Sequence, residues 1–288
     1  MDLVIQSTEL STAACDAFRV ALLGPRHLRH ACAARYFDVP SDPPTRRIVE
    51  ALAGFWRCDA AFVPPGLRAA GLRALVMDMD STAITIEGID ELAARAGQGA
   101  AVAALTEAAM RGEIRDYAQS LRQRVALLAG ADAELIEQVR VTAHLTPGAR
   151  ELLAGARALG WRTLLVSGGF SVLAAAVAAE LGFDEVVANE LGIEKGRLTG
   201  AVRGPPANDG AILDGPGKAR MLRELCERLS CPTDRAVAVG DGANDLAMMG
   251  LAGVSVAWHA KPRVREQARY ALDHAALDGV LELFADRW

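Results

Sequence analysis

The sequence predicts an α/β fold: a Rossmann-like, doubly wound parallel sheet with an inserted helical cap, preceded by a small N-terminal α+β domain. Three apolar runs end in polar residues at positions 78, 167 and 241, and helix-like segments follow the second and third runs. Such runs are typical of buried strands in parallel sheets. A helix-rich interval of about 88–144 separates the first two runs. It is several times longer than the crossover of about a dozen residues that joins parallel strands, so we predict an inserted cap.

The composition is that of a soluble globular chain with room for about two domains. Of the 288 residues, 51% are hydrophobic and 23% are charged, which is ordinary for this class. The formal charge of −5 argues against a general binder of nucleic acid or anionic membranes. The five cysteines lack CxxC spacing, which favours free thiols in a reducing compartment. With no signal-peptide pattern and no apolar run near the roughly 20 residues of a membrane span, we expect a cytoplasmic protein.

Residues 1–70 are expected to form a separate α+β module. Strand-like runs open and close it at 2–8 and 59–64, and two helix-like segments lie between them. The turn-rich run DVPSDPPT interrupts its middle. This segment carries no concentrated chemistry, so three roles stay open for it: regulation, self-association into a homo-oligomer, or structural support.

Residues 71–288 are expected to form the main domain, with LRALVMDMDST, WRTLLVSGG and RAVAVGDGAND as three strands and their polar ends. Ligands bind beyond the carboxyl ends of the strands in open α/β sheets, so the three polar clusters should share one pocket. LTPGARELLAGARALG then resumes the core as a helix with Pro147 in its first turn. The glycine-punctuated run ANELGIEKGRLTGAV predicts a hairpin.

Asp78 and Asp80 stand one residue apart at the end of the first run. Like charges so close raise the cost of ionising each other, so the pair calls for a cation or a reaction. One carboxylate can attack an electrophile while the other exchanges a proton with the leaving group and then with water. Mg²⁺ would relieve the repulsion. An isolated DxD is more often an exposed loop with two solvated aspartates, so the pair alone does not decide between these alternatives.

Ser167 and Gly168 follow the second run. A hydroxyl and backbone N–H groups at the start of a helix form a natural phosphate cradle. An ordinary turn with serine as the helix N-cap is the alternative. A serine nucleophile is disfavoured, because Leu165 stands where the GxSxG elbow requires glycine.

Lys218 lies in GPGK, which lacks the first glycine and the final hydroxyl of a P-loop. It is either a solvated surface charge or, if it points into the site, a neutralising partner for a transferring phosphoryl group.

Asp241, Asn244 and Asp245 lie in GDGAND, which departs from the dinucleotide-binding GxGxxG. These oxygen-bearing side chains could complete a Mg²⁺ shell or simply form a turn. Taken together, the clusters supply a nucleophile, a metal, charge neutralisation and positioning, which are the requirements of phosphoryl transfer.

The motifs resemble those of the haloacid dehalogenase (HAD) superfamily of phosphotransferases and, within it, the phosphoserine phosphatases. The resemblance covers residues 71 to about 285, with DMDST, SGG, Lys218 and GDGAND as the four motifs in order. It implies that Asp78 forms an aspartyl-phosphate, that Asp80 is the general acid and then base, and that Mg²⁺ is the cofactor. The resemblance places the remaining residues as follows: the metal on Asp78, Asp241 and the Asp80 backbone carbonyl; the phosphate on Ser167, Gly168 and Lys218; and support on the metal side from Asn244 and Asp245.

The same resemblance implies how an amino-acid phosphate would be selected. Glu87 matches the family glutamate near the substrate amine and Arg124 matches the arginine that grips the carboxylate, whereas read without the family both are ordinary surface charges. Met110 and Tyr117 match cap positions near the substrate, with Tyr117 in place of the more usual phenylalanine. The implied activity is Mg²⁺-dependent hydrolysis of O-phospho-L-serine to L-serine and phosphate, the last step of serine biosynthesis. The alternatives are transfer of the phosphoryl group to another alcohol such as homoserine, and a non-catalytic amino-acid sensor.

Overall fold

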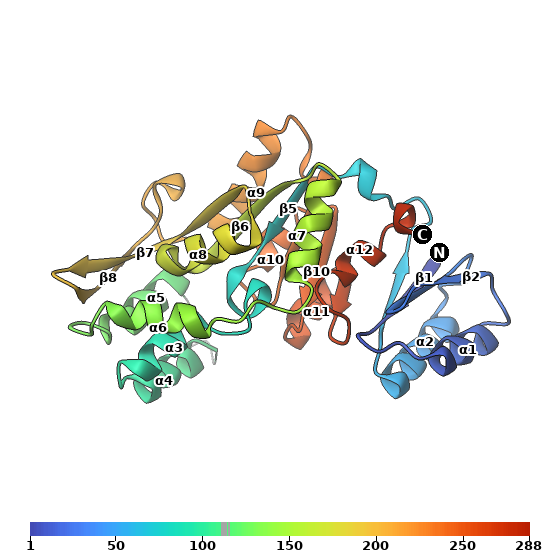
Figure 1. The fold of residues 1–288 in the computed structure, drawn as a ribbon, viewed down its shortest axis with the longest axis horizontal. Coiled ribbons are helices and arrows are strands. Elements are labelled where there is room, and N and C mark those ends of the chain that lie inside the picture. Colours follow the sequence, from blue (N-terminus) through green and yellow to red (C-terminus); the bar gives the residue numbers. More distant parts are fainter. Residues whose placement is uncertain (111–113, 115) are drawn as a thin grey trace.

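The computed structural model describes residues 1–110, 114 and 116–288. It contains a four-stranded sheet in the order β2-β3-β1-β4 and a seven-stranded sheet in the order β11-β10-β9-β5-β6-β7-β8. The larger sheet is parallel from β11 to β7, and β8 is antiparallel to β7. Figure 1 shows the small domain at one end of an elongated molecule and the cap helices at the other. The predicted parallel core, inserted helical cap and separate N-terminal α+β domain are confirmed.

The N-terminal domain has the βαββαβ order of a ferredoxin-like fold. Its elements are β1 (Asp2–Gln6), α1 (Thr12–Ala21), β2 (His27–Arg29), β3 (Ala33–Tyr36), α2 (Pro43–Trp56) and β4 (Asp59–Val63). Both helices begin at the side-chain caps typical of helix starts, because Ser11 accepts from the Ala14 N–H and Asp42 from the Thr45 N–H. The sequence predicted β1, β4 and both helices. It did not predict β2 and β3, which are only 3 and 4 residues long.

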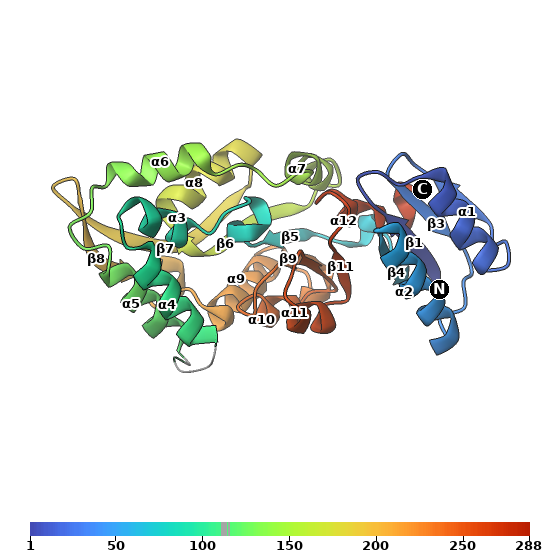
Figure 2. The same cartoon turned by 90° about the horizontal axis from the view of Figure 1, so that it is seen from below.

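The small sheet is fastened to the C-terminal segment of the chain (Figure 2). The Asp59 carboxylate accepts hydrogen bonds of 2.8–3.0 Å from the three consecutive backbone N–H groups of 273–275. Arg35 is completely buried, pairs with Asp2 at 2.9 Å and donates to the Leu283 carbonyl at 3.3 Å. The N-terminal domain therefore docks through buried charged groups on residues that follow the last core strand.

The core sheet is covered on both faces. Its strands are β5 (Ala74–Met77), β6 (Arg162–Phe170), β7 (Glu185–Glu194), β8 (Arg197–Arg203), β9 (Ala236–Gly240), β10 (Val254–Trp258) and β11 (Tyr270–Leu272). Its helices are α7 (Ala149–Ala158), α8 (Ser171–Leu181), α9 (Gly215–Arg228), α10 (Leu246–Met249), α11 (Pro262–Gln267) and α12 (Gly279–Glu282). Successive side chains of a strand point to opposite faces: Leu75 and Met77 join the core under α7 and α8, while Ala74 and Val76 join the core under α9 and α10. Figure 2 shows these helix layers on either side of the sheet.

The cap consists of α3 (Gly88–Arg95), α4 (Gly99–Met110), α5 (Tyr117–Ala126) and α6 (Glu134–Thr142). The predicted hairpin is present as β7 and β8, and it is joined to the cap by backbone hydrogen bonds. The Gly130 N–H donates to the Leu198 carbonyl at 2.8 Å and the Leu198 N–H donates to the Ala131 carbonyl at 2.9 Å. The cap is thus held both by its own chain connections and by this hairpin at the edge of the sheet. In the part of the chain that is described, no helix is long and apolar enough to cross a membrane.

Candidate active site

The ends of β5, β6 and β9 bring the three predicted clusters together. Asp78 directly follows β5, and its N–H donates to the carbonyl of Val239 in β9 at 3.0 Å. The chain then turns sharply, because Ser81 adopts a left-handed backbone with a φ of 53°. The turn returns the Gly88 N–H to Asp80 Oδ1 at 2.7 Å. Asp78 is 5% exposed, so the alternative of a solvated acidic loop is wrong for this residue.

Lys218 forms the centre of the site. Its Nζ lies 2.6 Å from Asp78 Oδ1 and 2.7 Å from Asp245 Oδ1, and the lysine side chain is completely buried. Burial alone would lower the pKa of Lys218, but the neighbouring Asp245 and Asp78 carboxylates raise it well above the usual value. The ammonium group is therefore charged, and the alternative of a surface lysine is wrong. The first turn of α9 carries it, after Asp214 caps that helix by accepting from the Gly217 N–H at 2.9 Å.

Three carboxyl groups of the site, those of Asp78, Asp80 and Asp241, have raised pKa values. Burial raises the pKa of Asp78 well above its usual range, Asp245 raises it further, and Lys218 opposes the shift. Burial and then the charge of Glu87 raise the pKa of Asp80 to about 6. Burial, Asp245 and Glu87 raise the pKa of Asp241 to about 7. Asp80 is thus suited to give and take a proton near neutral pH.

The same carboxylates fit a divalent cation. Oxygen atoms of Asp78, Asp241 and Asp245 lie within 4.8 Å of one another. Asp245 uses one oxygen for Lys218 and the other for the Gly242 N–H at 3.0 Å. Asp78 and Asp241 are therefore better placed than Asp245 to give an oxygen to a metal. The cluster carries more negative charge than one lysine neutralises, which a bound metal ion would balance.

Ser167 and Gly168 lie where the sequence predicted a phosphate cradle. Ser167 is completely buried, and its hydroxyl donates to Asp80 Oδ2 at 3.1 Å. It is not a helix N-cap, because α8 begins at Ser171 with Phe170 as its cap residue. A Cβ atom at Gly168 would lie 2.1 Å from the Tyr117 hydroxyl oxygen. Only glycine fits this approach, and Tyr117 brings the cap against the cradle.

The other predicted substrate residues lie around this centre. Glu87 is exposed, accepts from the Ser81 hydroxyl at 2.7 Å, and acts on the pKa of both Asp80 and Asp241. Arg124 is half-buried on α5; among the described residues its guanidinium donates only to the Ser120 carbonyl, at 3.4 Å. The structure therefore brings Glu87 to the carboxylates and leaves Arg124 in the cap, out of contact with them.

Two predicted residues remain. Asn244 is half-buried in the loop between β9 and α10, and this loop packs against the start of α9, where the Asn244 backbone carbonyl would lie 3.0 Å from a Cβ atom at Gly215. Met110 is the last residue of α4, and its side chain falls outside the described part of the chain.

Sequence reasoning missed two buried polar residues. Thr82 is completely buried and donates to Asp241 Oδ1 at 3.2 Å, which orients that carboxylate. Its signal was its place inside DMDST. Asn189 is completely buried in β7 and hydrogen-bonded at both ends of its amide. Its signal was a polar residue within the strand-like run VVANEL.

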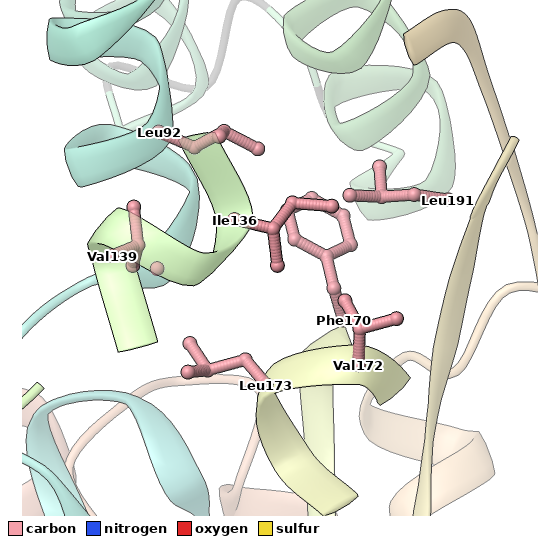
Figure 3. A pocket seen from close by; sticks show the side chains of 8 residues that line it. Leu92, Ile136, Val139, Phe170, Val172, Leu173 and Leu191 are labelled. Atoms are coloured by element: carbon pink, nitrogen blue, oxygen red, sulfur yellow. The ribbon is translucent and has the colours of Figure 1, made fainter. Parts of the chain in front are cut away.

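A separate small pocket lies beside the site, between α3 and α6 of the cap and α8 of the core. Its lining is apolar and includes Leu92, Ile136, Phe170 and Leu173 (Figure 3). A volume of about 10 Å³ holds at most about one water molecule. The pocket therefore belongs to the packing between cap and core and not to the substrate site.

Comparisons with known proteins agree with this geometry. A family model described as haloacid dehalogenase-like hydrolase matches residues 75–250. The chain therefore belongs to the haloacid dehalogenase-like hydrolases. Over 220 residues it is 50% identical to the phosphoserine phosphatase of Polaromonas sp. (strain JS666), which covers 76% of this chain and 92% of that protein.

Two solved structures extend the likeness. The probable phosphoserine phosphatase from Vibrio cholerae, in unliganded form, matches with a TM-score of 0.81 and 34% identity, covering 98% of this chain and 86% of that chain. A substrate-bound phosphoserine phosphatase matches with a TM-score of 0.67 and 32% identity, covering 74% of this chain and 98% of that chain.

Proposed function

We propose that this chain is a Mg²⁺-dependent phosphoserine phosphatase, which hydrolyses O-phospho-L-serine to L-serine and phosphate. The observation that carries the proposal is the arrangement of the buried Asp78 and Lys218 with the half-buried Asp80 at the carboxyl end of β5. A nucleophile, a proton donor and a fixed positive charge lie within one small space. The phosphoserine phosphatase names of the relatives support the substrate.

The reaction proceeds in two steps. The Asp78 carboxylate attacks phosphorus, and the bond between phosphorus and the seryl oxygen breaks. Asp80, protonated, donates its proton to that oxygen as serine leaves. Asp80, now a carboxylate, removes a proton from water as the water oxygen attacks phosphorus; the bond to Asp78 breaks and phosphate is released. A pKa of about 6 lets Asp80 take part in both directions near neutral pH.

Three other groups handle the negative charge of the phosphoryl group. Lys218, held between two carboxylates, stays protonated and presents a fixed charge. The Ser167 hydroxyl and the Gly168 N–H are proposed to bind phosphoryl oxygens. Lys218 and the Gly168 N–H are fixed by the fold and need no rearrangement when charge develops in the transition state, whereas the Ser167 hydroxyl must turn from Asp80 Oδ2 to donate to a phosphoryl oxygen.

Asp78, Asp241 and the backbone carbonyl of Asp80 are proposed to hold Mg²⁺, with Asn244 and Asp245 supporting that side of the site. When bound, the ion neutralises oxygen charge on the transferring group. Thr82 donates a hydrogen bond to one oxygen of Asp241 and, within the described part of the chain, leaves the other free. Both oxygens of Asp245 already accept hydrogen bonds, from Lys218 and from the Gly242 N–H. This division of roles follows from which carboxylate oxygens are already hydrogen-bonded.

Selection of the amino acid is assigned to Glu87 and to the cap. Glu87 would pair with the substrate ammonium, and Arg124 would bind the substrate carboxylate from the cap. Met110 and Tyr117 would complete the substrate site on the cap side.

All five cysteines are free thiols, which supports a cytoplasmic location. Self-association through the N-terminal domain stays a prediction.

The test is phosphate release from L-phosphoserine, phosphothreonine and several sugar phosphates, measured with Mg²⁺ and again with EDTA. Mg²⁺-dependent release that strongly favours phosphoserine is the expected result. Equal release from all esters would contradict the proposed substrate. Adding homoserine as an acceptor tests the fate of the phosphoryl group, and formation of phosphohomoserine in place of phosphate would contradict hydrolysis.

A further inference from the structure

We propose that Asn189 is a positioning residue for the reaction, holding the phosphate cradle, and through it Asp80, in register with the helix that carries Lys218. It touches none of the reacting groups. Its Nδ2 donates to the Gly168 carbonyl at 2.8 Å, and its Oδ1 accepts from the Leu213 N–H at 2.8 Å. The side chain is completely buried. The inference deepens the proposed function and rests on it.

The need for Asn189 comes from a break in the sheet. Ser167 of β6 pairs with Ala188 of β7, but the next pair is Phe170 with Asn189. Gly168 and Gly169 are therefore an insertion in β6 without a ladder partner. Bulges of this kind occur beside active sites, where they redirect the chain. Such a break leaves a buried carbonyl unpaired, and the Asn189 amide supplies the missing donor to Gly168.

A chain of hydrogen bonds connects the Gly168 carbonyl to Asp80, the proposed general acid. Gly168 and Gly169 share one planar peptide, whose carbonyl accepts from Asn189. The N–H of the same peptide donates to Ser167 Oγ at 2.8 Å, and the Ser167 hydroxyl donates to Asp80 Oδ2 at 3.1 Å. Chains of hydrogen bonds in a buried site polarise and align one another. Asn189 therefore fixes the plane that sets the position of Ser167 against Asp80.

The Oδ1 atom of Asn189 connects to the segment that carries Lys218, because it accepts from the Leu213 N–H. Leu213 directly precedes Asp214, the N-cap of α9, and Lys218 lies in the first turn of that helix. One side chain thus joins the insertion in β6 to the start of α9. Without it, the Gly168 carbonyl and the Leu213 N–H would both be buried without a partner. The cradle peptide could then rotate, and the distance between the cradle and Lys218 would no longer be fixed.

The test replaces Asn189 by leucine, which has a similar volume and neither hydrogen bond. The matched control is Thr163→Val. Thr163 is also completely buried, in β6, and also donates one hydrogen bond and accepts one, both with Asp184, at the other end of the strand. Both variants should lose stability. N189L should lower kcat by roughly 10- to 100-fold, because small misplacements of catalytic groups have effects of this size, whereas T163V should keep kcat within about threefold of wild type. Equal kcat in the two variants at similar loss of stability would overturn the proposal.

Asn189→Asp is the second variant and keeps the shape of the side chain. Its ionised carboxylate can still accept from Leu213 but cannot donate to Gly168, whereas its protonated form can do both. The ratio of N189D kcat to wild-type kcat should therefore rise as pH falls from about 9 to about 5.5. A ratio that does not change with pH would contradict the proposal, and this readout is available even if N189L does not fold.

All variants are assayed with both phosphoserine and p-nitrophenyl phosphate. Because Asn189 acts at the phosphoryl end, N189L should lower kcat by the same factor for both esters and change KM for phosphoserine by less than about threefold. If the wild type hydrolyses the aryl ester and not phosphoserine, the proposed substrate is wrong while the aryl ester still tests Asn189. A loss confined to phosphoserine would overturn the role of Asn189 at the phosphoryl end.

Discussion

The Lys218 ammonium group lies 2.6 Å from Asp78 and 2.7 Å from Asp245, and none of the three side chains is more than 6% exposed. One buried cation thus serves two carboxylates, and Asp80 and Asp241 add further negative charge nearby. Such a site is costly for the metal-free fold, because buried charges without full compensation are destabilising. That cost makes the stability of the metal-free protein depend on pH and on Mg²⁺.

Asp78→Asn should lower kcat for phosphoserine by more than about a thousandfold, because it removes the nucleophile. The isosteric amide should leave the fold intact and should not lower the melting temperature, since it removes one charge from a crowded acidic site. Phosphate release and thermal unfolding of the same preparation check both statements. Turnover above that limit in a clean preparation would contradict the role of Asp78.

Arg124→Ala should reduce kcat/KM for phosphoserine by about 10- to 100-fold, the value of a hydrogen bond to a charged group. The effect on p-nitrophenyl phosphate should be less than about threefold, because that ester has no carboxylate. Arg122→Ala is the matched control, an exposed arginine on the same helix. Equal losses with the two esters would remove Arg124 from substrate binding.

Without metal, the free energy of unfolding should decrease as pH rises from about 4 to about 7. The folded-state pKa values are about 6 for Asp80 and about 7 for Asp241, above their values in the unfolded chain. In this window the folded state binds more protons than the unfolded state, so raising pH favours unfolding. Urea titrations in EDTA across this range provide the measurement. Stability that increases through the window would contradict the raised pKa values.

Mg²⁺ should restore stability at pH 7.5, because it binds the folded state and balances the carboxylates. In EDTA, Asp241→Asn should have a higher melting temperature than the wild type. Adding Mg²⁺ should raise the melting temperature of the wild type but not that of Asp241→Asn. Thermal unfolding with and without Mg²⁺ separates this effect from loss of turnover. If D241N kept the full Mg²⁺ response, Asp241 would not be a ligand.

Asp59→Ala should weaken docking of the N-terminal domain, because three backbone N–H groups of 273–275 would lose their buried acceptor. We expect a loss of at least about 2 kcal/mol and faster proteolysis near the proposed domain boundary at residue 70. Asp42→Ala is the control, since it removes only an exposed helix cap worth about 1 kcal/mol. Equal proteolysis of the two variants at the boundary would contradict the docking role of Asp59.

Local patterns were sufficient to predict much of the site. Asp78, Ser167 and Asp241 each follow a short apolar run, and the parallel sheet brings such strand ends together. The contact of Lys218 with Asp245 was not predictable in this way. The two residues are 27 positions apart, and their contact depends on how α9 packs on the sheet.

The rest of the fold depends on contacts that the sequence pattern does not encode. β2 and β3 are too short to show periodicity, and β10 and β11 carry no polar cluster to mark their ends. The attachment of Asp59 to residues 273–275 joins the two ends of the chain, so only tertiary packing reveals it. The sequence shows Asn189 as a polar residue within VVANEL, but the role proposed for it depends on the insertion at Gly168, which only the strand pairing reveals.

In the proposed reaction the phosphoryl group passes through Asp78, and this step can be trapped directly. Excess enzyme with Mg²⁺ is mixed with ³²P-labelled phosphoserine, quenched in acid within milliseconds, and the labelled peptide is identified. We predict transient, alkali-labile label on the peptide containing Asp78, and none in Asp78→Asn. Rapid turnover with no labelled protein at any time, or label on a different residue, would contradict the account.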